Sequence, residues 1–199
     1  MKSQVQNFLH QAIQALNNNN VLLAEKNCLK ALQIDEKNFN CLNILGTIKG
    51  MQHKPSEAIK YLLAAIDINP NDFAAQFNLA KAYLDTKQYL LSIPHHKKAL
   101  YLNKSNADAF VNYAKSLKEI GQIQESLLCY EKALEINPKD FEVWLFKGLV
   151  LNNLMKYEDA INSFNTSIAI NSNYWNAYLS KADCLNDLKR HNEAIACYD

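Results

Sequence analysis

The sequence predicts an all-α protein, a solenoid in which antiparallel pairs of helices stack one behind another. Its composition supports this class. Of 199 residues 49% are apolar, and only four are glycine and four proline, fewer than a fold with many tight turns uses. The stronger evidence is a period of 34 residues in which small residues recur. Two of these series are Ala24, Ala58, Ser92, Ser126, Ala160 and Ala194, and Ala12, Gly46, Ala80, Ala114, Gly148 and Ala182.

Helix packing explains this period. Small residues let the two helices of a pair approach closely, and bulky residues at fixed offsets, such as Leu45 and Leu62, fill the remaining space. Apolar positions within each helix recur at spacings of three and four, as in an amphipathic helix. An Asn-Pro pair follows Ile68 and again Ile136, and proline ends a helix because it lacks an N–H donor. We therefore expect each unit to hold two helices of about 14 residues joined by a short turn.

We expect residues 1–199 to form a single array of six repeats. The predicted boundaries are 5–38, 39–72, 73–106, 107–140, 141–174 and a shortened 175–199. Pro94 falls inside the second helix of the third unit. There we expect either a bend that adjusts the shape of a groove, or a late helix start or tolerated kink. Because the last unit is short and no capping helix follows, we hypothesise that the chain is a piece of a longer protein or self-associates through this uncapped C-terminal end.

The fourth unit carries a family resemblance. The residues concerned are Ala114, Leu117, Gly121, Ser126, Tyr130 and the run Ala133-Leu134-Glu135-Ile136-Asn137-Pro138. They resemble a tetratricopeptide repeat (TPR), and the resemblance extends over about residues 5–199. It implies a right-handed superhelix whose concave surface is lined by the first helices, a role in protein–protein binding, and no fixed catalytic residues.

The net charge limits the classes of binding partner, and the cysteine pattern indicates the cellular compartment. Lys and Arg number 21 and Asp and Glu 20, so the net charge of +1 gives no field that would draw the protein to nucleic acid or to a membrane surface. The five cysteines form no C-x-x-C motif, which favours a reducing compartment. The polar N-terminus lacks the apolar region of a signal peptide. We predict a cytoplasmic protein that binds a protein or peptide, with no nucleic-acid or membrane partner.

The sequence offers no catalytic, cofactor or metal-binding arrangement. His95 and His96 are adjacent, so on a helix they point about 100° apart and cannot chelate one ion. His96 takes the bulky position that Tyr130 and Phe164 hold in other units, which favours a core or boundary role. We find no nucleophile motif and no glycine-rich phosphate loop. We therefore predict no enzyme activity within this chain.

In the family that the chain resembles, fixed positions of the first helices line the groove. Mapped onto this sequence, the candidate peptide-binding residues are Asn43, Phe77, Asn78, Lys81, Val111, Asn112, Lys115, Leu145, Phe146 and Leu149. Asparagine amides both donate and accept, so they can bind the backbone of an extended peptide. The lysines favour an acidic group, and the apolar residues could supply pockets. The alternative interpretation is an ordinary solvated face.

Two further hypotheses remain beside the groove-binding scaffold. Asn78 and Asn112 are similar to the asparagine ladder of O-linked N-acetylglucosamine transferases, which implies a substrate-recruiting region of a larger enzyme whose catalytic domain lies beyond residue 199. The array could also be a structural spacer. The carboxylate clamp of chaperone-binding repeats is excluded, because Glu142 and Phe146 stand where it needs Lys and Arg.

Overall fold

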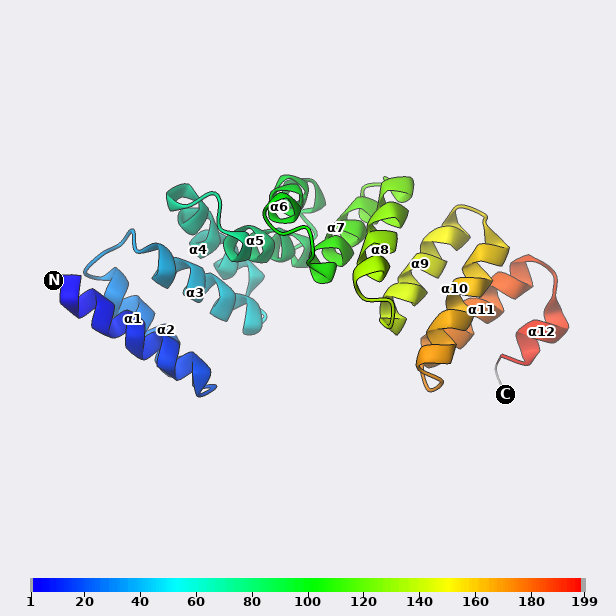
Figure 1. The fold of residues 1–199 in the computed structure, drawn as a ribbon, viewed down its shortest axis with the longest axis horizontal. Helices are drawn as coiled ribbons and strands as arrows, with labels where there is room; N and C mark the ends of the chain where they lie inside the picture. The colour runs from blue at the N-terminus through cyan, green and yellow to red at the C-terminus, as the bar shows by residue number, and fades with distance from the viewer. Residues whose placement is uncertain (1, 198–199) are drawn as a thin grey trace. The chain divides into compact units, whose positions relative to one another are not determined.

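The computed structural model describes residues 2–197, and all regular secondary structure in this range is helical (Figure 1). Its helices are α1 (Lys2–Asn17), α2 (Val21–Leu32), α3 (Phe39–Met51), α4 (Pro55–Ile68), α5 (Phe73–Asp85), α6 (Tyr89–Leu102), α7 (Ala107–Glu119), α8 (Ile123–Ile136), α9 (Phe141–Asn153), α10 (Tyr157–Ile170), α11 (Trp175–Asp187) and α12 (His191–Ile195). Each odd-numbered helix packs against the even-numbered helix that follows it. The prediction of an all-α protein built from helix pairs is confirmed.

The chain divides into two compact units, and each has its own packed core. The first unit covers residues 1–104 and contains α1 to α6; the second covers residues 105–199 and contains α7 to α12. Within each unit, the second helix of one pair also packs on the first helix of the next. The six repeat boundaries given above stay a prediction.

Four of the first helices begin in the same way. Their N-cap residues are Asn38, Asp72, Asn106 and Asp140, spaced by 34 residues. Each of these side chains accepts a hydrogen bond from the backbone N–H three residues later, at 2.8–3.2 Å. Asn and Asp are favoured here because a helix cannot satisfy its own first N–H groups. The period therefore fixes the helix starts as well as the core.

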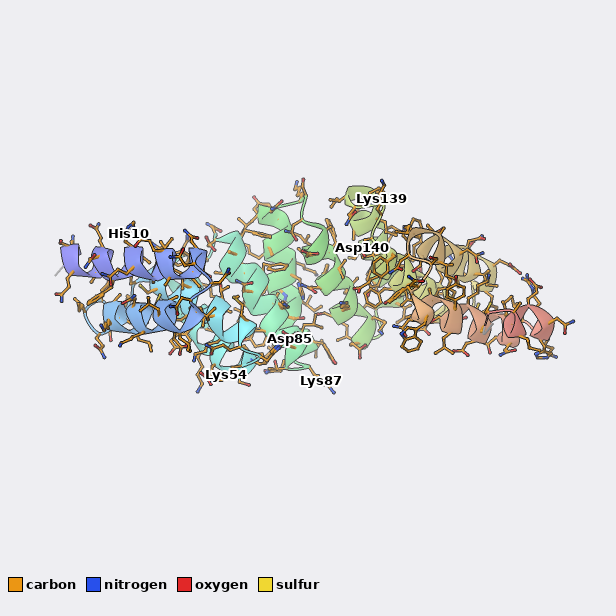
Figure 2. The ribbon with its side chains drawn as sticks, turned by 90° about the horizontal axis from the view of Figure 1, so that it is seen from below. His10, Lys54, Asp85, Lys87, Lys139 and Asp140 are labelled. Carbon is orange, nitrogen blue, oxygen red and sulfur yellow. The ribbon has the colours of Figure 1, made fainter. Side chains whose placement is uncertain are left out.

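The turn inside each pair has one backbone conformation throughout. The chain enters the left-handed region at Asn19, His53, Lys87, Gly121, Met155 and Lys189, with φ between 56° and 81°. The next residue donates its N–H to the carbonyl five residues back, as from Lys54 to Lys49 and from Lys156 to Leu151, both at 2.9 Å. The side chain of Lys87 projects to the outside of this turn (Figure 2). Five of the six residues are not glycine, and each of these five carries a conformational free-energy cost that glycine would avoid.

Two glycines in the small-residue series mark where helices cross. A Cβ on Gly46 would lie 2.6 Å from Cδ2 of Leu62, and a Cβ on Gly148 would lie 2.6 Å from Cδ1 of Phe164. Leu62 and Phe164 are fully buried. The absence of a side chain at these two positions is what lets a bulky residue of the second helix reach the centre of the pair.

Helix α6 contains Pro94 and both adjacent histidines. It begins at Tyr89, so the alternative of a late helix start is wrong, and the proline lies within the helix and is exposed. His96 is fully buried, which confirms its core role, and burial together with His95 lowers its pKa to about 3. Nδ1 of His95 lies 2.8 Å from Oε1 of Gln76, and its ring stacks on Tyr83 at 5.7 Å between centroids.

None of the helices within residues 2–197 is both long enough and apolar enough to cross a lipid bilayer.

Candidate functional site

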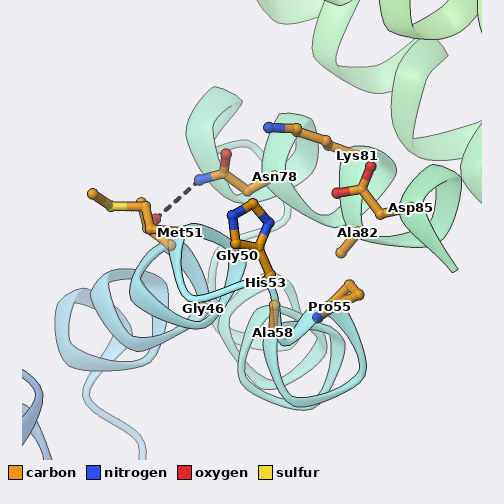
Figure 3. A pocket seen from close by; sticks show the side chains of 11 residues that line it. Gly46, Gly50, Met51, His53, Pro55, Ala58, Asn78, Lys81, Ala82 and Asp85 are labelled. Atoms are coloured by element: carbon orange, nitrogen blue, oxygen red, sulfur yellow. Dashed lines mark hydrogen bonds between the residues drawn. The ribbon is translucent and has the colours of Figure 1, made fainter.

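The first unit contains a pocket between α3, the start of α4 and α5 (Figure 3). Its cavity volume is about 530 Å³. The lining residues are Gly46, Thr47, Gly50, Met51, His53, Pro55, Ala58, Asn78, Lys81, Ala82 and Asp85. Two of the predicted groove residues, Asn78 and Lys81, thus lie in one concave site.

Small residues in part of the wall help to keep the pocket open. A Cβ placed on Gly50 would meet no atom within 4 Å, although this residue lies in the last turn of α3. Ala58 and Ala82 form two other parts of the wall. The left-handed conformation of His53 turns the chain from α3 into α4, and its imidazole points into the same space as the side chain of Asn78 (Figure 3).

Polar groups from two helices converge on this space. Nδ2 of Asn78 donates a hydrogen bond to Oγ1 of Thr47 at 3.0 Å, and Thr47 donates to the carbonyl of Asn43 at 3.0 Å. This chain of hydrogen bonds orients the Asn78 amide. Its own carbonyl oxygen accepts no hydrogen bond from the described residues and can accept one from a guest.

The same pocket holds one cation and one anion. Lys81 and Asp85 are four residues apart on α5, so they share a helix face, and both are exposed. Neither forms an ion pair with another residue of the range 2–197. The arrangement can therefore offer a positive donor, a negative acceptor and an amide to a single bound segment.

The other predicted residues of the first unit have partners within the fold. Nδ2 of Asn43 lies 3.4 Å from Oδ1 of Asp72, the N-cap of α5, and its own Oδ1 is buried with no hydrogen-bond partner among the described residues. Phe77 is half-buried and stacks on Phe73, with 5.6 Å between ring centroids.

The remaining predicted residues lie in the second unit. Nζ of Lys115 sits 4.7 Å from the ring centroid of Phe146, which in turn contacts Tyr130 at 5.9 Å. Val111, Asn112 and Leu149 are half-buried.

Leu145 differs from the other predicted groove residues. It is only 5% exposed and belongs to the packed core of the second unit. The expectation that it supplies an open apolar surface is therefore corrected: its side chain fills the space between helices, and it leaves the set of candidate contact residues.

Nine of the eleven lining residues are not among the predicted peptide-binding residues. Six of them lie on the first helices α3 and α5 at positions outside the predicted set. The other three, His53, Pro55 and Ala58, belong to the turn and to the second helix α4, which a mapping onto first helices leaves out. One signal in the sequence could have found the site. Gly50 stands where the next repeats have Leu84, Lys118, Asn152 and Asn186, so a side chain is missing at one step of the period.

Within the described range, no three His, Cys, Asp or Glu side chains are grouped closely enough to hold a metal ion. The chemistry that the pocket offers is thus hydrogen bonding and charge pairing by Asn78, Lys81 and Asp85.

Comparisons with known proteins identify the repeats. Models of the tetratricopeptide repeat match residues 45–109, 107–140, 129–162 and 176–199. No curated protein sequence matches the chain.

Solved structures of repeat proteins are similar in fold. One is YrrB, described as a TPR protein with an unusual peptide-binding site; it has 18% identity and a TM-score of 0.79, over 85% of this chain and 88% of that one. A structure of MamA has 20% identity and a TM-score of 0.76, over 80% of this chain and 87% of that one. A tetratricopeptide repeat protein from Parabacteroides merdae has 18% identity and a TM-score of 0.80, over 98% of this chain and 77% of that one.

Proposed function

The chain belongs to the tetratricopeptide repeat family, a scaffold for protein interactions, and from that premise we propose that it binds an extended segment of a partner protein. The segment lies on the surface of the first helices, and the pocket between α3, α4 and α5 anchors it.

One observation carries this proposal. Asn78, Lys81 and Asp85 surround a cavity of about 530 Å³. The cavity stays open at Gly50 because glycine has no side chain to fill it. An extended backbone presents N–H and C=O groups in alternation, and the amide of Asn78 can pair with either. A charged side chain of the guest would pair with Lys81 or Asp85 according to its sign.

The other predicted residues take supporting roles in this proposal. Phe77, Val111, Phe146 and Leu149 offer apolar contact, while Asn112 and Lys115 repeat the chemistry of Asn78 and Lys81 in the second unit. Asn43 acts by holding the N-cap of α5, the helix that carries Asn78 and Lys81.

The alternative role is substrate recruitment for a larger enzyme, and no specific observation favours it. Asparagines occupy the ladder position only at Asn78 and Asn112, and Ile44, Phe146 and Ser180 interrupt the row.

The proposal is tested by selecting binders from a phage-displayed library of random peptides and measuring a selected synthetic peptide by fluorescence anisotropy. Gly50→Phe fills the pocket and should weaken binding at least about tenfold, as should Asn78→Ala combined with Lys81→Ala. The fold should survive Gly50→Phe, because the space beside Gly50 is open.

Lys156→Ala combined with Asn162→Ala is the matched control. These residues are exposed in the second unit, outside the pocket, and their replacement should leave the affinity unchanged. Failure to enrich any peptide, or equal affinity for wild type and Gly50→Phe, contradicts the proposal.

A further inference from the structure

The two units carry opposite net charges. Residues 1–104 contain 12 Lys and Arg against seven Asp and Glu, a formal charge of +5; residues 105–199 contain nine against 13, a formal charge of −4. The overall charge of +1 conceals this asymmetry. Complementary charge on different parts of one chain is a basis for attraction between copies, because each copy presents both signs.

The outward face of α6 exposes two large apolar side chains. Leu90 is 74% exposed and Tyr101 is 72% exposed. The position equivalent to Leu90 is polar in α4, α8 and α10, as Ser56, Gln124 and Glu158, but in α2 it is Leu22, which is 77% exposed. The positions equivalent to Tyr101 include Asp67 and Glu135. Helix α6 thus exposes large apolar side chains at two positions that are both polar in α4 and in α8.

The charge on this face has one sign. Helix α6 contains Lys97 and Lys98 and no acidic residue. Neither lysine forms an ion pair with any residue in the described part of the chain; Nζ of Lys98 lies 5.5 Å from the ring centroid of Tyr101. Pro94 also lacks the N–H that would bond to the carbonyl of Leu90 in a regular helix. An apolar stripe and two lysines form a surface suited to another protein rather than to water.

The outward face of α8, in the second unit, has the matching chemistry. Leu128 is 61% exposed and lies between Glu125 and Glu135, both exposed. Glu135 is paired with Lys132 at 2.8 Å, but both side chains are more than half exposed, and such a surface pair contributes little. Glu125 has no ion pair among the described residues.

The spacing of the two faces also agrees. Leu90 and Lys97 are seven residues apart on α6, and Leu128 and Glu135 are seven residues apart on α8. Two turns of helix place each leucine and its charge on one face. A single parallel alignment therefore sets leucine on leucine and lysine on glutamate.

We propose that the outward face of α6 binds the outward face of α8 of a second copy of this chain. The contact joins two different surfaces, so it is heterologous. Its small apolar area makes it a weak contact that forms at high protein concentration. It involves neither the pocket of the first unit nor the C-terminal end.

Charge exchange tests the pairing directly, with the full chain and sedimentation velocity as the readout. Wild type at about 50 mM salt should show an average mass that rises above 22.7 kDa with protein concentration, and at about 1 M salt the rise should diminish. Lys97→Glu with Lys98→Glu makes both faces acidic, and Glu125→Lys with Glu135→Lys makes both basic. Each double variant alone should associate at least about tenfold more weakly than wild type.

Mixing the two double variants should restore association, because an acidic α6 then meets a basic α8. This rescue also shows that both variants are folded. Leu90→Ser and Leu128→Ser should each weaken association without changing its salt dependence.

Lys37→Glu with Lys60→Glu is the control, since it lowers the charge of the first unit by the same amount and leaves α6 untouched. It should retain wild-type association. The proposal is overturned if wild type stays at 22.7 kDa at every concentration, if the mixture fails to associate, or if the control weakens association as much as the α6 variant does.

Discussion

The contact between α2 and α3 in the first unit and the contact between α8 and α9 in the second hold equivalent residues of opposite character. Lys49 is 7% exposed, and its Nζ lies 2.7 Å from Oε1 of Glu25 and 3.1 Å from Oε2 of Glu57. Three periods later, Leu151 stands in place of Lys49 and Leu127 in place of Glu25, and both leucines are buried in one cluster.

The ion cluster is fully connected. Gln52 donates to Oε2 of Glu25 at 2.8 Å, and the hydrogen bonds from Lys49 and Gln52 hold the pKa of Glu25 below its usual value. The hydrogen bond to Glu25 raises the pKa of Lys49. One position of the repeat thus accepts either an ion pair or a leucine pair, because what the scaffold requires is a filled and satisfied contact rather than a particular residue.

A polar residue also replaces an apolar one in the core of the first unit, and the largest expected effect on stability arises there. His96 occupies in α6 the place of Tyr130 and Phe164 in the second unit. Its pKa in the folded chain is about 3, against about 6.5 when unfolded, so the unfolded state takes up the proton first. Stability should fall below pH 6.5 by about 1.4 kcal/mol per pH unit and level off near pH 3. His96→Leu should remove this part of the pH dependence in urea titrations, and an unchanged profile would refute the assignment.

Truncating the apolar contact between α8 and α9 should have the second largest effect on the free energy of unfolding. Leu151→Ala removes buried apolar atoms and leaves a cavity, which should lower the free energy of unfolding by about 3 kcal/mol. Because no charge is involved, the loss should be equal at pH 7 and pH 4 and at low and high salt. A clear salt dependence in urea denaturation would count against an apolar contact.

Lys49→Ala should have a smaller effect with a different signature. It leaves Glu25 without its cation and should lower the free energy of unfolding by about 2 kcal/mol at pH 7. The lowered pKa of Glu25 means that its stabilisation is complete above about pH 4.3 and is lost as the pH falls through the folded value. The difference between wild type and variant should therefore shrink as the pH falls below about 4.3. The double replacement Glu25→Leu with Lys49→Leu should recover most of the loss, as the second unit predicts.

Substitutions in the turns should change the free energy of unfolding equally in the two units, and these changes should be the smallest. Lys87→Gly and Met155→Gly should each raise stability by about 0.5–1 kcal/mol, because glycine adopts the left-handed conformation without steric cost. Gly121→Ala should lower it by a similar amount. Thermal melting curves of the three variants measure these changes, and a loss on either glycine substitution would mean that the side chain, not the backbone, sets the turn.

Much of the fold could be predicted from the sequence, because the 34-residue period is a packing rule repeated many times. Gly46 and Gly148 lie under Leu62 and Phe164 as the small and bulky series require. The single departures were harder to interpret. Pro94 sits inside a helix that starts at Tyr89, since tertiary packing outweighs the local cost of proline.

The candidate site was only partly predictable. Asn78 and Lys81 could be found from their positions on a first helix, but the pocket also depends on the small wall residues and on the turn at His53. Leu145 was misplaced because a helix position alone does not say whether a neighbouring pair covers it. The Lys49 and Glu25 pair is not visible in the apolar periodicity of the sequence, because two charged residues stand where that pattern has apolar ones.

The uniform left-handed residue between the helices of each pair has an evolutionary consequence. If the gene is cut at two of these equivalent codons and rejoined, a whole number of helical hairpins is removed or duplicated. The new junction then has the same backbone geometry as the existing turns. Unequal recombination can therefore lengthen or shorten such a protein without inventing a new loop. Selection then acts on which side chains come to face each other across the new junction.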